Sequence, residues 1–226
     1  MKFLFDDESF SFEALRAAGY ASRGGADLGE VLAACAGIPD GDEEAWCREC
    51  GALAHRIYEA GLAALTAGHR VSARDALLRA SNYYRTAEFY RRGGPDHDAE
   101  SQRLAGLSRE SFAAAAELLD VPARRVSIPY EGTTLPGYLF RVDDSGTARP
   151  TVVYHGGFDS TLEEGYFAAA RGRLSAATTC WHSTVPDRRR PAGCRAWCSA
   201  RTGRRSSPRS STTPSLCLKS MSTEWC

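Results

Sequence analysis

The 226-residue sequence lacks several features that would point directly to a function. It has no apolar run approaching the roughly 18 residues of a membrane-spanning helix, so we expect no membrane segment. Its first eight residues, Met1-Lys2-Phe3-Leu4-Phe5-Asp6-Asp7-Glu8, become acidic at once and contain no apolar core of a secretory signal. We therefore expect a cytoplasmic protein. No internal repeat is visible.

The last part of the sequence has few residues that could form a core. Residues 174–226 contain ten Ser, seven Thr, eight Arg and five Cys, but only four residues of the types Leu, Ile, Val and Phe. A segment this poor in large apolar side chains cannot bury enough surface to offset the entropy lost on ordering. The composition predicts an irregular or disordered tail over residues 174–226.

The formal net charge of zero conceals two parts of opposite sign. Residues 174–226 carry nine Lys or Arg against two acidic residues, whereas residues 1–173 carry 19 basic and 26 acidic residues. A basic arm of this kind can bind nucleic acid or an acidic partner. The tail lacks the interleaved aromatic residues of a base-stacking surface, so nucleic-acid binding is disfavoured. A non-enzymatic helical module with a basic protein- or nucleic-acid-binding tail remains the alternative interpretation.

Cysteine is scarce outside the tail. The first 173 residues contain only Cys35, Cys47 and Cys50. Cys47 and Cys50 are spaced by three within a predicted helix, without the turn that a zinc knuckle needs. We interpret them as helix-packing residues and predict neither a metal site nor a cofactor.

Apolar spacing predicts a helical N-terminal region, residues 1–122. After a short helix in the first 20 residues, side chains recurring at intervals of three and four predict helices over about 42–67, 72–92 and 98–119. Ser72 stands where an N-cap belongs, with Asp75 three residues later. Gly68 suits the end of the first long helix, and Gly93-Gly94-Pro95 suits the end of the second.

The periodicity changes after residue 122. Residues 125–130 and 135–142 resemble two strands of a hairpin, and residues 151–154 form a short apolar run typical of a buried strand. A helix is expected from about residue 161. The fold class is therefore α/β, with the helical region followed over residues 123–173 by the first strands of an incomplete sheet.

The third predicted strand ends in His155-Gly156-Gly157. Two glycines allow a tight turn, and backbone N–H groups at a turn before a helix favour a developing negative charge. On this pattern alone, an ordinary strand-to-helix turn fits equally well.

A longer stretch resembles a known family. Ile128-Pro129-Tyr130-Glu131-Gly132-Thr133-Thr134-Leu135-Pro136-Gly137-Tyr138, followed by His155-Gly156-Gly157-Phe158-Asp159-Ser160-Thr161 and Glu163-Glu164, is similar to the α/β-hydrolase superfamily. More narrowly, it resembles the bacterial branch that contains 2,6-dihydroxypseudooxynicotine hydrolase and dipeptidyl-aminopeptidase-like or acylaminoacyl-peptidase-like proteins. Residues 79–89 resemble that branch's helical cap. The resemblance covers roughly residues 40–170.

The resemblance implies a serine hydrolase that uses a Ser–Asp–His triad on ester, amide, peptide or C–C bonds. The family's first oxyanion-hole N–H maps onto Phe158, with Gly157 shaping the turn. Small-molecule or peptide substrates are implied for intact relatives, and a homodimer is one expected arrangement. Residues that could face the substrate pocket are Asn82, Tyr83, Tyr84 and His155, although core packing is the favoured interpretation for the first three.

The catalytic triad itself is missing from the sequence. The family presents its nucleophile in a Gly-x-Ser-x-Gly elbow, and this pattern does not occur here. Ser160 has no base in reach and is interpreted as the cap of the helix beginning near Thr161. We therefore assign no catalytic triad residue and expect this chain to be truncated before the nucleophile and inactive.

A shifted reading frame explains the tail. Codons for residues 180–187, read from the third base of each codon, permit Leu-Ala-Phe-Asp-Gly-Pro-Gly-Gln, which resembles the branch's fourth strand. Our hypothesis is a frameshift between about Ala170 and Ser175. The third strand is then expected to keep an unpaired edge, which lowers solubility.

Overall fold

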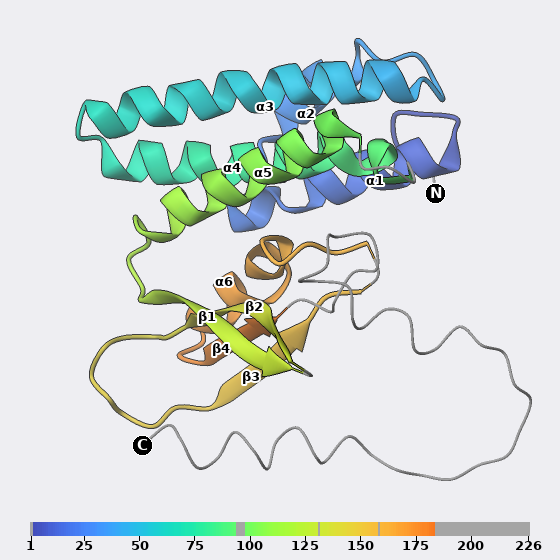
Figure 1. Ribbon diagram of the computed structural model, residues 1–226. Coiled ribbons are helices and arrows are strands. Elements are labelled where there is room, and N and C mark those ends of the chain that lie inside the picture. The colour runs from blue at the N-terminus through green and yellow to red at the C-terminus, as the bar shows by residue number, and fades with distance from the viewer. Residues whose placement is uncertain (1, 94–97, 131, 158, 184–226) are drawn as a thin grey trace, which may run out of the picture.

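The computed structural model of the protein describes residues 2–93, 98–130, 132–157 and 159–183. A layer of helices lies against a small sheet that carries its own short helix (Figure 1). The helical layer consists of α1 (Glu8–Gly19), α2 (Leu28–Cys35), α3 (Glu43–Thr66), α4 (Arg70–Glu88) and α5 (Ala99–Ala116), with short 3-10 turns at Ala21–Arg23 and Phe89–Gly93. The three long helices expected from apolar spacing are confirmed as α3, α4 and α5.

Aspartate side chains start four of these helices. Asp7, Asp27, Asp42 and Asp98 each accept a hydrogen bond from a backbone N–H in the first turn of their helix. The predicted cap at Ser72 is wrong, because α4 already begins at Arg70 after His69 and makes no side-chain cap bond. Ser72 therefore lies within the first turn of α4.

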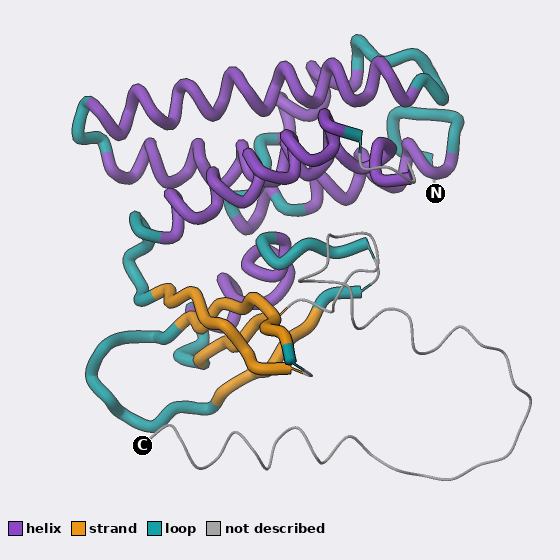
Figure 2. Tube along the Cα trace, in the orientation of Figure 1, coloured by secondary structure: helices purple, strands orange, loops and turns teal. Residues whose placement is uncertain are grey.

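The sheet has four strands, and they run in the order β1-β2-β4-β3. Strands β1 (Ala123–Tyr130) and β2 (Thr133–Phe140) form the predicted antiparallel hairpin. Gly132 has a φ of 79°, the left-handed conformation that a tight hairpin turn requires. A long loop then leads to β3 (Thr151–His155), as Figure 2 shows.

The fourth strand lies where the sequence predicted a tail. After a π-helical turn (Tyr166–Ala170) and α6 (Arg171–Leu174), β4 (Thr179–Ser183) pairs in parallel with β3 and antiparallel with β2. The boundary expected at residue 174 is thus too early by about ten residues, because the crossover helix returns the chain to the sheet. Residues 184–226 of the predicted tail lie outside the described residues.

The strand order agrees with the expectation that β3 keeps one unpaired edge, within the described residues. One edge of β3 is paired along its whole length, from Thr151 opposite Thr179 to His155 opposite Ser183. In the described part of the chain no strand pairs with its other edge. Val153, on this edge strand, is 60 % exposed.

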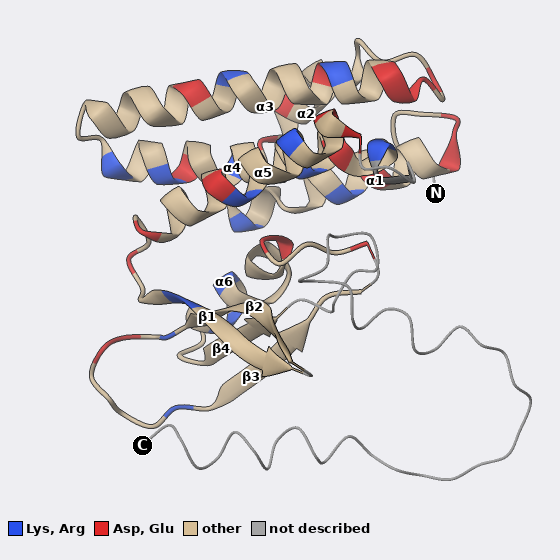
Figure 3. Cartoon of the chain, in the orientation of Figure 1, with Lys and Arg blue, Asp and Glu red and all other residues tan. Residues whose placement is uncertain are grey.

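An apolar core joins the helical layer to the sheet. Phe112 of α5 lies at its centre, with ring centroids 5.2 Å from Tyr138 of β2 and 5.7 Å from Tyr166. Leu77 and Leu78 of α4 belong to the same buried cluster. The core therefore crosses the predicted boundary at residue 122. Most charged side chains, by contrast, lie on the helical layer, and the strands carry few (Figure 3).

Candidate active site

The turn after β3 is built around a glycine that cannot be replaced without strain. Gly156 is buried, and a Cβ added there would lie 2.4 Å from the Cβ of Ser160. A Cβ at the exposed Gly157 meets no described atom within 4 Å. The steric demand for glycine thus falls on Gly156 and not on Gly157, which the sequence interpretation had shaping the turn.

Two hydrogen bonds close this turn on itself. The Ser160 N–H donates to the Gly157 carbonyl over 3.2 Å, and the Gly157 N–H donates to the Ser160 Oγ over 3.2 Å. The Gly157 N–H is therefore already engaged within the turn. Phe158, the residue whose N–H the resemblance assigns to the oxyanion hole, lies outside the described residues, so that role stays a prediction.

The helix after the turn begins with a capping box. The Thr161 N–H donates to the Glu164 carboxylate over 2.9 Å, and the Glu164 N–H points back to the Thr161 Oγ1 over 3.4 Å. The predicted cap at Ser160 is wrong, because its hydroxyl bonds to the Gly157 N–H instead. The chain after the glycines is thus held by side chains at both the turn and the helix start.

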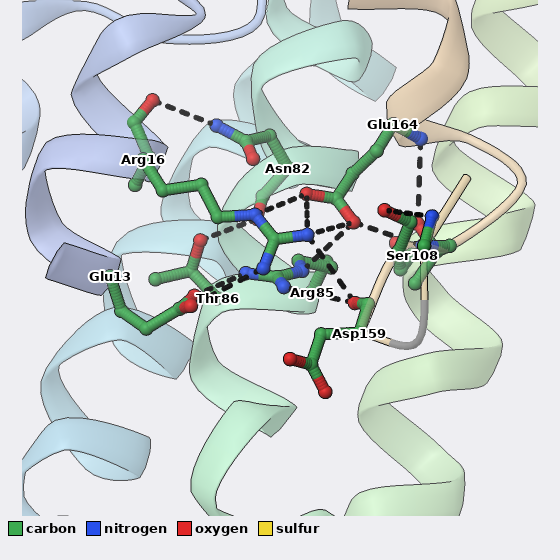
Figure 4. A network of polar contacts seen from close by, with 12 residues as sticks. Glu13, Arg16, Asn82, Arg85, Thr86, Ser108, Asp159 and Glu164 are labelled. Carbon is green, nitrogen blue, oxygen red and sulfur yellow. Dashed lines mark hydrogen bonds and ion pairs between the residues drawn. The ribbon is translucent and has the colours of Figure 1, made fainter. Parts of the chain in front are cut away.

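Two guanidinium groups from the helical layer reach the same turn (Figure 4). The Arg85 Nη2 of α4 and the Arg16 Nη2 of α1 both donate to the Asp159 carbonyl, over 3.1 Å and 3.3 Å. One backbone oxygen of the turn is therefore bound by two helices that lie far from it in sequence.

These arginines belong to a buried group of four charges, which we call the Arg–Glu cluster: Glu13, Arg16, Arg85 and Glu164. Arg85 contacts Glu13 at 2.6 Å and Glu164 at 3.2 Å, and Arg16 binds both Glu164 oxygens at 3.0 Å. Glu13, Arg85 and Glu164 are at most 3 % exposed. Two positive and two negative charges balance, which is what burial of ionised groups requires.

Tyr20 borders this cluster, and its pKa is raised there. Its hydroxyl donates to Glu164 over 3.3 Å. Burial, followed by the nearby Glu164 carboxylate, raises the pKa of Tyr20 to about 12. The hydroxyl is thus held as a hydrogen-bond donor to the cluster at neutral pH.

Sequence reasoning missed the Arg–Glu cluster. A signal existed in α4, where Leu78, Ser81 and Arg85 are spaced by three and four and so share the buried face. An arginine on a buried face needs a compensating charge, but its partners lie in other elements, in α1 and at the start of the helix after the turn. No local sequence pattern identifies these partners.

The predicted pocket residue Asn82 is bonded inside the helical layer. Its side-chain amide donates to the carbonyls of Ala17 and Gly25, over 3.2 Å and 2.8 Å, and only 2 % of the residue is exposed. These bonds fix the end of α1 and the loop that follows. A contact with substrate stays a prediction for Asn82.

The two tyrosines after Asn82 are also bonded within the helical layer. The Tyr83 hydroxyl accepts the Asp27 N–H over 2.7 Å and donates to Glu30 over 2.8 Å. The Tyr84 hydroxyl lies 3.5 Å from Nδ1 of His55. Tyr83 also lines a small apolar cavity between α1, α2, α3 and α4, to which no residue of the turn contributes. For both tyrosines, a place in the substrate pocket stays a prediction.

His155, the last residue of β3, and His182, the residue before the end of β4, differ in burial. His155 is exposed, with its Nδ1 3.2 Å from the Gly156 carbonyl. His182 is 1 % exposed, and neither ring nitrogen has a hydrogen-bond partner among the described residues. Burial, opposed by Glu164 and helped by His155, lowers the pKa of His182 to about 4. His182 is therefore a neutral, unsatisfied imidazole in the core.

Within the described ranges, no group of three or more His, Cys, Asp or Glu side chains is arranged to hold a metal ion. None of the helices in those ranges is both long enough and apolar enough to cross a membrane.

No family model matches the sequence. Among curated proteins, the chain is 40 % identical over 195 residues to the hydrolase acrC of Aspergillus aculeatus, a match covering 77 % of this chain and 45 % of that protein. It is 42 % identical over 162 residues to the alpha/beta hydrolase pydG of an Acremonium species, covering 70 % of this chain and 37 % of that protein. The chain thus spans less than half the length of these relatives.

Among solved structures, the chain is similar to 2,6-dihydroxy-pseudo-oxynicotine hydrolase, with a TM-score of 0.60 and 22 % identity, over 77 % of this chain and 45 % of that one. It also matches AbyA5, with a TM-score of 0.50 and 16 % identity, over 85 % of this chain and 47 % of that one. Over the matched region the chain belongs to the α/β-hydrolase superfamily, as its sequence motifs predicted. The curated relatives that it matches are named as hydrolases.

Proposed function

We propose that this chain carries the oxyanion-hole side of a serine-hydrolase active site, with the N–H of residue 158 as one donor. The observation that supports the proposal is the His155-Gly156-Gly157 turn, which is closed on itself, follows a parallel strand and precedes a capped helix. Such a turn presents backbone N–H groups to a carbonyl oxygen as it gains negative charge. Small-molecule or peptide substrates with an ester, amide or C–C bond beside a carbonyl fit this role.

The nucleophile, its base and the second oxyanion donor have no counterpart in the sequence. Because no Gly-x-Ser-x-Gly occurs in the 226 residues, we propose that this chain alone hydrolyses no ester. The assay is release of nitrophenol from nitrophenyl acetate by the purified chain, compared with a heat-unfolded sample. Turnover that only the folded sample shows would contradict this part of the proposal.

We further propose that the residues from about 175 onward are read from a shifted frame. His182 supports this, because β4 occupies a place in the sheet yet puts an imidazole without partners into the core. The shifted frame offers Leu-Ala-Phe at this point, and those side chains have no polar atoms to satisfy. Sequencing the locus tests the idea. A shifted frame that encodes neither a strand nor a Gly-x-Ser-x-Gly elbow downstream would contradict the proposal.

The oxyanion role is tested in the gene with its frame restored. Phe158→Pro removes the proposed N–H donor, whereas Phe158→Ala keeps the donor and serves as the matched control. Loss of one such donor lowers kcat by about a hundredfold to a thousandfold. We expect that loss with proline and a much smaller change with alanine, measured with nitrophenyl acetate. Equal activities in the two variants would contradict the assignment.

A further inference from the structure

We propose that Arg85 is a positioning residue for the turn, and that the helical layer holds the Asp159–Ser160 peptide and the Gly157 carbonyl through it. The inference rests on the proposed function, since it concerns the same turn. It concerns a residue in the last turn of α4, 2 % exposed, that the family resemblance does not assign to the site.

The first step is the peptide unit between Asp159 and Ser160. Its carbonyl oxygen accepts hydrogen bonds from Arg85 and Arg16, and its N–H donates to the Gly157 carbonyl. Because a peptide unit is planar, bonds at its two ends fix its orientation. The helical layer therefore holds this unit from one side and the turn holds it from the other.

The second step is the peptide unit that follows Gly157. Its carbonyl is the one that accepts the Ser160 N–H, and its own N–H belongs to residue 158. Since the Ser160 N–H is itself fixed from the Asp159 side, the Gly157 carbonyl is held by the same contacts. The two peptide units thus form a relay from the arginines to the Gly157 carbonyl.

The positive charges of the arginines also favour the hydrogen bonds along the relay. Positive guanidinium groups at the Asp159 oxygen polarise that peptide, which makes the Ser160 N–H a stronger donor to the Gly157 oxygen. Since Glu13 and Glu164 balance the arginines, this gain comes without an unpaired buried charge.

Glu164 ties the relay to the helix that follows. Its carboxylate accepts the Thr161 N–H and also contacts Arg85 and Arg16. Two arginines therefore bind the turn at the Asp159 carbonyl, and Glu164, the carboxylate that pairs with them, binds the chain at the Thr161 N–H. A displacement of α1 or α4 relative to the sheet would change both contacts together.

The test uses the chain as it is and reads individual amides by hydrogen exchange and 15N–1H NMR. Arg85→Lys keeps the charge but loses the forked group that reaches both Glu13 and Asp159. We expect the Ser160 amide to exchange roughly tenfold faster and the Gly157 cross-peak to shift, while amides of β1 and β2 keep their rates.

Glu13→Gln is the matched control, because it weakens the same cluster without touching the Asp159 carbonyl. A merely structural role for Arg85 predicts that both variants change all amides to a similar extent. An unchanged Ser160 rate in Arg85→Lys, or an equal change in Glu13→Gln, overturns the proposal.

If Arg85→Lys does not fold, the same comparison is made with Arg16→Lys, whose side chain is more exposed and also reaches the Asp159 carbonyl. The exchange result does not depend on catalysis, so the two proposals can fail separately. Faster Ser160 exchange together with an active Phe158→Pro enzyme would reject the oxyanion role and keep the positioning role. An unchanged Ser160 rate with an inactive Phe158→Pro enzyme would reject the positioning role alone.

Discussion

The Arg–Glu cluster and the end of β4 contain buried polar groups that are treated in opposite ways. In the cluster, each guanidinium and carboxylate has an opposite charge within 3.2 Å, although the partners come from α1, α4 and the helix after the turn. In β4, neither ring nitrogen of His182 has a hydrogen-bond partner among the described residues. Nε of Arg85 makes no hydrogen bond among those residues either, but it lies 3.2 Å from a Glu164 oxygen. Opposite charges compensate the burial of the cluster, whereas no described residue compensates the burial of His182.

The largest expected effect comes from breaking the cluster. Arg85→Met removes one of two cations and leaves Glu13 and Glu164 to share Arg16, so we expect a loss of about 3–5 kcal/mol in the free energy of unfolding. Urea unfolding followed by circular dichroism measures it. Arg48→Met, at an exposed pair with Glu49, is the control and should cost less than about 1 kcal/mol. Similar losses in both variants would remove the contrast between buried and exposed pairs.

The second effect concerns the turn. Gly156→Ala forces a Cβ toward Ser160, and we expect a loss of about 1–3 kcal/mol from overpacking. Gly157→Ala meets open space and should change stability by less than about 1 kcal/mol. Thermal unfolding of the two variants side by side makes the comparison. A greater loss of stability in Gly157→Ala would show that Gly157, the residue expected from the sequence to shape the turn, is the sterically required glycine.

The third effect has the opposite sign. His182→Leu removes two unsatisfied polar atoms from the core, so we expect a gain of about 1–2 kcal/mol in the free energy of unfolding near neutral pH. Cys180→Ser, one inward-facing position earlier on β4, adds a polar group to the core and should lower stability. If His182→Leu lowers stability as well, the imidazole fits the core better than its missing partners suggest.

The smallest expected effect is a dependence of the free energy of unfolding on pH. Burial holds the pKa of His182 near 4, below its ordinary value of 6.5, so between these values the unfolded chain binds the proton and the folded chain does not. Stability therefore falls as the pH is lowered through this window, by roughly 1 kcal/mol per pH unit, and is unaffected above it. The difference between parent and His182→Leu, measured by urea unfolding from pH 7 to pH 5, isolates the slope due to His182, because both proteins keep every other titratable group. Parallel curves would contradict the lowered pKa.

The elements that the sequence predicted correctly share a local cause. Helices α3, α4 and α5 and the β1–β2 hairpin follow from apolar spacing that repeats within each segment. The wrong expectations depended on neighbours that spacing does not show. Ser160 turned to Gly157 instead of capping a helix, and the apolar-poor residues 179–183 became a strand because β2 and β3 offered free edges on both sides.

By itself, the sequence determined the three long helices, the hairpin, the strand that ends in two glycines and the superfamily, because each depends on residues close together in the chain. Only the tertiary structure decided which of those glycines is sterically required, which groups Arg85 contacts and that His182 is buried. The first answer depends on how the turn brings Ser160 beside Gly156. The other two depend on contacts between distant segments: Asp159 beside Arg85, and Gly165 beside His182. Folding creates these contacts, and no spacing along the chain records them.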